Sequence, residues 1–151
     1  VQSVWWEKQL AQRSCTKVPF LFASYHKPPY GTAKPPSGTK DSSKDPLAQK
    51  IIKNWCPLFD KYNVTAVFEN DHHTYKRTYP LSNNRIDHKR GVVYMGDGCW
   101  GVDTRDVPKP GEVWYLAKAE SKRHLICITI SDGKPNYVAF EANGKVIDQH
   151  S

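Results

Sequence analysis

Long hydrophobic runs are missing from this sequence of 151 residues. No apolar stretch approaches the roughly 20 residues that a membrane-spanning helix needs, so we expect no segment embedded in a membrane. A Cys-x-x-Cys pair is also missing, because the four cysteines stand apart at positions 15, 56, 99 and 127. This spacing argues against a zinc ribbon or a thioredoxin-type site, and it leaves all three disulfide pairings open. The sequence has neither an initiator methionine nor a signal-peptide pattern, so we expect the numbering to begin within a longer polypeptide.

The sequence does have the length and the aromatic content of one folded domain. It contains five Trp, eight Tyr and five Phe, and neither an internal repeat nor a linker divides it. The 22 Lys and Arg residues outnumber the 15 Asp and Glu residues, which gives a formal net charge of +7. Such a charge attracts a phosphate-bearing or nucleic-acid partner over long range, but it also suits a plain solvated surface. We do not expect nucleic acid as the partner, and we make no prediction of the oligomeric state.

The first half of the sequence predicts a strand, a helix and a second strand in succession. The apolar run Val18–Tyr25 predicts a strand that is buried on both faces. Asp45 followed by Pro46 is typical of a helix start, and Pro57 then kinks or restarts that helix. A second strand is expected over Val64–Glu69. In open α/β sheets, ligands bind where such strands end.

Outside this unit, the sequence predicts a first helix and a set of short strands. The helix is expected over Ser3–Arg13, with Ser3 as its N-cap. The strands are expected over Gly91–Met95, Val113–Lys118, Leu125–Ile130 and Tyr137–Glu141. Two strong hairpin signals, Asp132-Gly133 and Asn143-Gly144, follow the last two of these strands. This part therefore predicts an antiparallel meander at the C-terminal end.

Histidines stand at the ends of both predicted strands. His26 follows the first strand, and two prolines directly behind Lys27 fix it at a corner. Asp71, His72 and His73 follow the second strand. An acid and two imidazoles beside the end of a buried strand are costly unless something binds them, and both groups are ordinary metal ligands. The sequence therefore predicts a metal site at these strand ends, although a structural, hydrogen-bonded role for His26 stays open.

Four segments resemble the calcineurin-like metallophosphoesterases, and most of all their purple acid phosphatase branch. In that family a strand ends in a His with a Pro two residues on, as His26 and Pro28 do. The family signature Gly-His-x-His-x-Tyr-x-Arg falls on residues 70–77, which read NDHHTYKR. The resembling segments are Trp5–Leu10, Val18–Tyr30, Trp55–Leu81 and Gly91–Val102.

The resemblance implies hydrolysis of phosphate monoesters at acid pH by a pair of metal ions, ferric iron with zinc, manganese or a second iron. Metal ions about 3.5–4 Å apart clamp the phosphate and activate a bound hydroxide. By resemblance, His73 would bind the first metal and His26 the second. The leading His of the family signature is replaced by Asp71. Either Asp71 binds the second metal, or His72 does after a one-residue rearrangement, or the second site is lost.

The resemblance also predicts that part of the domain lies outside this sequence. The family's other ligands belong to Asp-x-Gly, Gly-Asp-x-x-Tyr and Gly-Asn-His-Asp/Glu motifs upstream, and this sequence has no Asp-x-Gly and no Asn-His. The turn Gly96–Trp100 is interpreted as structural and not as a substitute for the second motif. We therefore expect residues 1–151 to be the C-terminal half of a four-layer α/β/β/α sandwich, with the N-terminal half as its partner. No residue can be assigned as the catalytic acid.

Two further interpretations stay open. A catalytically inactive relative would bind phosphorylated or nucleic-acid partners through the basic surface, and the replacement at Asp71 favours it. A plain structural domain is the other. The resemblance implies a secreted or lysosomal protein, and the sequon Asn63-Val64-Thr65 makes Asn63 a glycosylation candidate.

Overall fold

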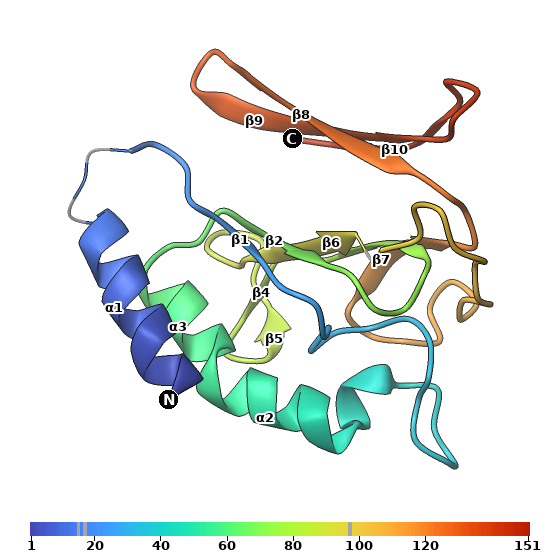
Figure 1. Ribbon diagram of the computed structural model, residues 1–151, viewed down its shortest axis with the longest axis horizontal. Coiled ribbons are helices and arrows are strands. Elements are labelled where there is room, and N and C mark those ends of the chain that lie inside the picture. Colours follow the sequence, from blue (N-terminus) through green and yellow to red (C-terminus); the bar gives the residue numbers. More distant parts are fainter. Residues whose placement is uncertain (15, 17, 97) are drawn as a thin grey trace.

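The computed structural model describes residues 1–14, 16, 18–96 and 98–151 of the chain. Helices, a five-stranded sheet and a three-stranded sheet form three successive layers (Figure 1). The helices are α1 (Gln2–Ser14), the 3-10 turn η1 (Ser42–Lys44), α2 (Pro46–Asn54) and α3 (Cys56–Lys61). The strands are β1 (Phe22–Ser24), β2 (Ala66–Glu69), β3 (Tyr75–Thr78), β4 (Leu81–Ser82), β5 (Arg85–Ile86), β6 (Val93–Gly96), β7 (Leu116–Glu120), β8 (Leu125–Ser131), β9 (Lys134–Phe140) and β10 (Val146–His150).

The helix predicted from Asp45-Pro46 is confirmed. The Asp45 carboxylate accepts hydrogen bonds from the N–H groups of Leu47 and Ala48, which would otherwise lack partners at the helix start. Helix α2 ends at Asn54, and α3 restarts at Cys56 with Pro57 in its first turn. A proline is tolerated there because the first N–H groups of a helix have no partner within it.

Strands β1 and β2 are parallel neighbours, with Phe22 opposite Ala66 and Ser24 opposite Phe68. Helices α2 and α3 connect them, as the sequence predicts. The sheet continues with β6, parallel to β2, and then with β3 and β7, which are antiparallel. Because β1 and β2 run the same way, their carboxyl ends meet at one edge of the sheet.

The five-stranded sheet has an apolar core on each face. Val67 of β2 and Tyr94 of β6 belong to the core under the helices. Their neighbours in the chain, Ala66 and Met95, point to the other face and pack with Tyr137 of β9. This alternation is the two-residue period of a strand with both faces covered.

Two expectations about the first 25 residues are wrong. Strand β1 covers only Phe22–Ser24 of the predicted run, and Val18 is 50% exposed. Among the described strands it pairs only with β2, at the edge of the sheet, so no second described strand holds its start. Helix α1 begins at Gln2, which places Ser3 inside the helix and not at its N-cap.

The antiparallel C-terminal sheet is confirmed for its last three strands. Strands β8, β9 and β10 pair in sequence order. Asp132 and Gly133 both have positive φ angles, as the predicted two-residue hairpin turn requires. Strand β7 departs from the prediction, because it pairs with β3 in the five-stranded sheet and not with β8.

Two expectations drawn from what the sequence lacks can be compared with the structure. Within the described residues, no helix combines the length and the apolar character needed to cross a bilayer. Among the described residues, Cys56 and Cys127 form no disulfide. Cys15 lies outside the described residues, so the pairings that involve it stay open.

Candidate functional site

The two predicted strand ends bring His26 and Asp71 together. His26 Nε2 lies 3.3 Å from Asp71 Oδ1, although 45 positions separate the residues in the sequence. Two hydrogen bonds extend the pairing beyond the strands, from Tyr25 N to Phe68 O and from Asn70 N to His26 O. The His26 side chain is 66% exposed and that of Asp71 only 11%. The carboxylate therefore forms the floor of the site, and the imidazole lies at its rim.

Two lysines from the loop after β1 bind the other carboxylate oxygen of Asp71. Lys27 Nζ lies 2.8 Å and Lys34 Nζ 3.2 Å from Asp71 Oδ2. Burial by itself would raise the pKa of Asp71, but the hydrogen bonds from Lys27 and Lys34 outweigh it and hold that pKa at about 2. Asp71 is therefore ionised, and it organises two cations in front of the strand ends.

His72 is held by backbone groups of the same loop. Its Nδ1 accepts hydrogen bonds from the N–H groups of Thr32 and Ala33, each at 3.0 Å. A nitrogen that accepts must carry a lone pair, so the proton of the neutral ring lies on Nε2. Gly31 makes this packing possible, because a Cβ atom there would lie 2.1 Å from His72 Cε1. His72, which occupies a variable position of the family signature, thus holds the loop against the end of β2.

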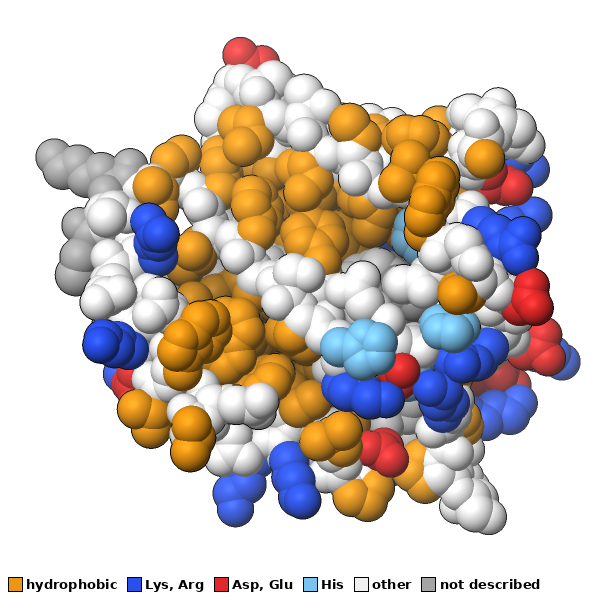
Figure 2. All heavy atoms as spheres, in the orientation of Figure 1, with side chains coloured by type: hydrophobic (Ala, Val, Ile, Leu, Met, Phe, Trp, Pro, Cys, Tyr) orange, Lys and Arg blue, Asp and Glu red, His pale blue; other side chains and the backbone are white. Residues whose placement is uncertain are grey.

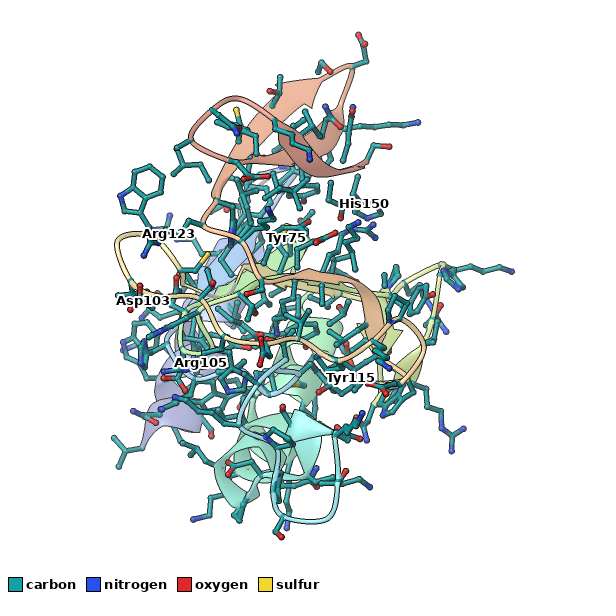
Figure 3. All side chains as sticks on the ribbon, turned by 90° about the vertical axis from the view of Figure 1, so that its right-hand side faces the viewer. Tyr75, Asp103, Arg105, Tyr115, Arg123 and His150 are labelled. Carbon is teal, nitrogen blue, oxygen red and sulfur yellow. The ribbon has the colours of Figure 1, made fainter. Side chains whose placement is uncertain are left out.

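His73 adopts a left-handed backbone conformation, with φ at 58°. A loop after β6 fixes this segment from the other side. Arg105 donates from its N–H to the His73 carbonyl and from Nη1 to the Asp71 carbonyl. Arg105 lies along the same side of the molecule as Asp103 and Arg123 (Figure 3), which are joined by an ion pair. The backbone from Asp71 to His73 is therefore clamped between two loops.

A buried ion pair lies behind the site. Glu69, the last residue of β2, pairs with Lys76 of β3, and both side chains are fully buried. Tyr25 donates its hydroxyl to Glu69, and Lys76 also donates to the carbonyl of Tyr30. Because a buried charge is stable only when it is paired and hydrogen-bonded, these contacts fix β1, β2 and β3 relative to one another.

The site opens into a hollow of about 220 Å³, whose walls include Lys27, Lys34, Asp71 and His72. Figure 2 shows histidine side chains among Lys and Arg side chains on one face of the molecule, beside a broad hydrophobic area. The walls of the hollow thus carry two lysines, Lys27 and Lys34, and two carboxylates, Asp71 and Asp45. The two lysine ammonium groups can donate charge-assisted hydrogen bonds to an anion.

The donor set fits one edge of a metal site but not a complete one. Two ligands that each lie about 2.1 Å from one cation are roughly 3.0–3.4 Å apart, which agrees with the distance between His26 and Asp71. Among the described residues, however, no group of three His, Cys, Asp or Glu side chains could hold a metal ion. His26 and His72 each lie near Asp71, at 3.3 and 3.8 Å, on different carboxylate oxygens. The three side chains do not form a metal-holding group, and His73 does not complete one. Any complete centre needs ligands beyond these.

Sequence reasoning found the histidines and Asp71 but not the residues that position them. Arg105 lies in a loop without a recognisable motif, and it acts through backbone carbonyls 32 and 34 residues away. Lys76 precedes Arg77, at a variable position of the family signature. The sequence there gives no indication that the lysine side chain is buried. Asn63, the glycosylation candidate, lies exposed at the turn after α3.

No family model matches the chain, and no curated protein matches it. Solved structures match the chain in fold. The purple acid phosphatase PPD1 from seeds of yellow lupin (Lupinus luteus) superposes with a TM-score of 0.82 at 20% sequence identity, over 98% of this chain. The chain therefore shares the fold of the matching part of this structure. GAP50, the anchor in the inner membrane complex of Plasmodium, superposes with a TM-score of 0.70 at 13% identity, over 96% of this chain.

These likenesses confirm the α/β fold with an antiparallel C-terminal sheet that the sequence predicts. At such low identity they show the fold alone. The chain spans 27% of the length of the lupin enzyme and 39% of the length of GAP50. What the whole protein does is therefore inferred from the site.

Proposed function

We propose that this chain is the C-terminal portion of a catalytic domain that hydrolyses phosphate esters, with the ester bound at the ends of β1 and β2. The observation that carries the proposal is the 3.3 Å approach of His26 Nε2 to Asp71 Oδ1. A nitrogen and an oxygen atom from the ends of two neighbouring strands thus lie about as far apart as two ligands of one metal ion. The likeness to a purple acid phosphatase supports a phosphate ester as the substrate class.

In this proposal His26 and Asp71 hold one edge of a divalent metal ion, and the N-terminal half of the domain supplies the remaining ligands. A bound metal pair, iron with zinc, manganese or a second iron, would polarise the phosphate and lower the pKa of a bound water. Of the alternatives at the replaced position, the geometry favours Asp71 over His72. The Nδ1 atom of His72 already accepts two backbone hydrogen bonds. His73 remains the candidate ligand of the first metal.

The chain's own contribution is to bind and orient the phosphate. Lys27 and Lys34 are both half-exposed at the hollow, so an incoming phosphate can take hydrogen bonds from them without burying a cation. Their pairing with Asp71 keeps the two ammonium groups in place before the phosphate arrives. The acid that protonates the leaving group stays unassigned.

Metal analysis of variants of the polypeptide that contains this chain tests the proposal. His26→Ala and Asp71→Ala should each lower the bound metal by about one equivalent, whereas His72→Ala should retain it. The exposed His88 provides the matched control, and His88→Ala should leave the metal content unchanged. Retention of both metals in His26→Ala and Asp71→Ala would contradict the ligand assignment.

A second candidate is an inactive relative that binds phosphorylated partners without metal. The ion pairs of Asp71 with Lys27 and Lys34 favour it, because they satisfy the carboxylate in the absence of a cation. Phosphate binding that persists in a chelator and weakens with salt, without hydrolysis, would select this candidate. Metal-dependent hydrolysis would select the first.

A secreted or lysosomal location is part of the proposal. Asn63 is exposed, as a glycosylated asparagine must be, and Thr65 completes its sequon. In protein purified from secreting cells, removal of N-linked glycans should lower the mass of wild type but not of Asn63→Gln. An unmodified Asn63 in secreted protein would remove this support.

A further inference from the structure

Arg105 joins the strand-end site to the loop that follows β6. Its guanidinium Nη1 donates a hydrogen bond to the Asp71 carbonyl at 2.9 Å, and its backbone N–H donates to the His73 carbonyl at 3.2 Å. The described residues that line the hollow of about 220 Å³ do not include Arg105. Its side chain therefore reaches the site through the backbone of Asp71 and not through the hollow.

The backbone between β2 and β3 needs such a support. Strand β2 ends at Glu69 and β3 begins at Tyr75, so residues 70–74 belong to neither strand. His73 has a φ angle of 58°, in the left-handed region that is unfavourable for a residue with a Cβ atom. Such a conformation persists only where the surrounding contacts hold it. The two hydrogen bonds from Arg105 are contacts of this kind, because they hold the carbonyl groups of Asp71 and His73.

The direction of the Asp71 carboxylate depends on this backbone. One carboxylate oxygen lies 3.3 Å from His26 Nε2, and the other lies 2.8 Å from Lys27 Nζ and 3.2 Å from Lys34 Nζ. A single methylene group joins the carboxylate to Cα, so a rotation of the Asp71 backbone moves both oxygens away from these partners. A contact that fixes the Asp71 carbonyl therefore also fixes where its carboxylate points.

The loop that carries Arg105 is itself held at the start of β8. Arg123, just before that strand, donates from Nε to the Val102 carbonyl at 2.8 Å and forms an ion pair with Asp103. Figure 3 shows Arg123, Asp103 and Arg105 along one side of the molecule. The ion pair with the fully exposed Asp103 contributes little, so the hydrogen bond to the Val102 carbonyl is the effective anchor. The loop thus gives the guanidinium of Arg105 a fixed base.

We infer that Arg105 is a positioning residue of the strand-end site. By holding the carbonyl of Asp71, it keeps one carboxylate oxygen facing His26 and the other facing Lys27 and Lys34. The inference rests on the proposed function for the ligand of the site, which is a phosphate group. Arg105 does not contact that phosphate. Its side chain acts on Asp71, Asp71 holds the two lysines, and the lysines bind the phosphate.

Calorimetry with inorganic phosphate, on the polypeptide that contains this chain, tests the inference. Arg105→Ala should lower the affinity about 5-fold, because the two lysines are no longer held in place before the phosphate arrives. Arg105→Lys keeps a charged donor and should restore the affinity to within about twofold of wild type. Arg85→Ala removes the same charge from an exposed position on β5 and is the matched control, with unchanged affinity.

Two outcomes of this experiment are distinct. Equal affinity in Arg105→Ala and wild type would overturn the positioning role and leave the phosphate site in place. Absence of phosphate binding in wild type would overturn the proposed function, and the inference with it. Thermal unfolding of each variant shows that the compared proteins are folded.

A double-variant comparison separates positioning from direct attraction of the phosphate by the charge of Arg105. In an Asp71→Ala background Lys27 and Lys34 remain, so phosphate binding can still be measured. Addition of Arg105→Ala should change the affinity there by less than about twofold, since the carboxylate that Arg105 positions is gone. A further loss of about 5-fold in this background would show that the charge acts on the phosphate directly, and it would contradict the inference.

Discussion

His26 and Asp71 meet through their side chains at 3.3 Å, from the ends of two parallel strands that are hydrogen-bonded neighbours. The carboxylate is shared: one oxygen faces the imidazole, and the other faces Lys27 and Lys34. In the proposed function, this division lets one carboxylate act as a metal ligand and also hold two lysines for the phosphate. The predictions below test its parts separately.

Loss of one lysine should weaken phosphate binding. Lys27→Ala and Lys34→Ala each remove one charged donor from the hollow, and each should lower the affinity for inorganic phosphate about 5- to 10-fold. Calorimetry at low and high salt measures the affinity for phosphate. Added salt should reduce the difference in affinity between wild type and each variant. Lys44→Ala changes an exposed lysine outside the hollow and is the control. Equal losses in all three variants would show that only the net charge matters.

Gly31 should tolerate no side chain while His72 is present. Gly31→Ala places a Cβ atom 2.1 Å from His72 Cε1, so the ring must move away from the amides of Thr32 and Ala33. We expect a loss of about 1–3 kcal/mol in the free energy of unfolding. In a His72→Ala background the same substitution should cost much less, because the space is vacant. Additive losses in the double variant, measured by denaturant unfolding, would contradict this packing.

Asp148 should stabilise the protein in a pH-dependent way. It accepts hydrogen bonds from Tyr75 and Arg77 and so ties β10 to β3. Burial raises the pKa of Asp148, but the hydrogen bonds from Arg77 and Tyr75 prevail and lower it below 3.8. A carboxyl group whose pKa is lower in the folded protein than in the unfolded chain stabilises the fold. This stabilisation is fully present at pH values above the pKa in the unfolded chain, and it is lost as the pH falls through the pKa in the folded protein.

Asp148→Asn should therefore cost about 1–2 kcal/mol of unfolding free energy at pH 7, and the difference from wild type should shrink below pH 4. Thermal unfolding from pH 3 to pH 7 measures it. Asp103→Asn is the control, because Asp103 is fully exposed in its ion pair with Arg123 and should contribute little. A difference between Asp148→Asn and wild type that is constant with pH would contradict the assigned pairing.

Strand β8 should make the isolated chain associate. In the described sheet it pairs only with β9, and Leu125, Ile128 and Ile130 are exposed along it. Exposed apolar edges of this kind recruit further strands. Ile130→Lys should lower the association seen by sedimentation at increasing concentration. Val146→Lys, at the same exposure of 55%, tests β10, which is the other edge strand of this sheet. A monomer at all concentrations in wild type would contradict the expectation.

The sequence predicted the elements whose signals are local and the site residues that follow from topology. Asp45 and Pro46 predict the start of α2. The order of strand, helix and strand predicts that His26 lies beside Asp71. The sequence did not predict the contacts that depend on the path of a loop. Lys34 reaches Asp71, and Arg105 reaches the carbonyl of Asp71, only because of the path that each loop takes. Strand β1 is shorter than its apolar run because edge position, not hydrophobicity, sets its length.

The measurement that tests the central claim most directly is phosphate-ester hydrolysis by the polypeptide that contains this chain. With p-nitrophenyl phosphate we expect metal-dependent turnover, abolished by a chelator. Asp71→Ala should lower it by about 100-fold or more, and His88→Ala should leave it unchanged. Absence of turnover with bound metal, or full activity in Asp71→Ala, would contradict the claim.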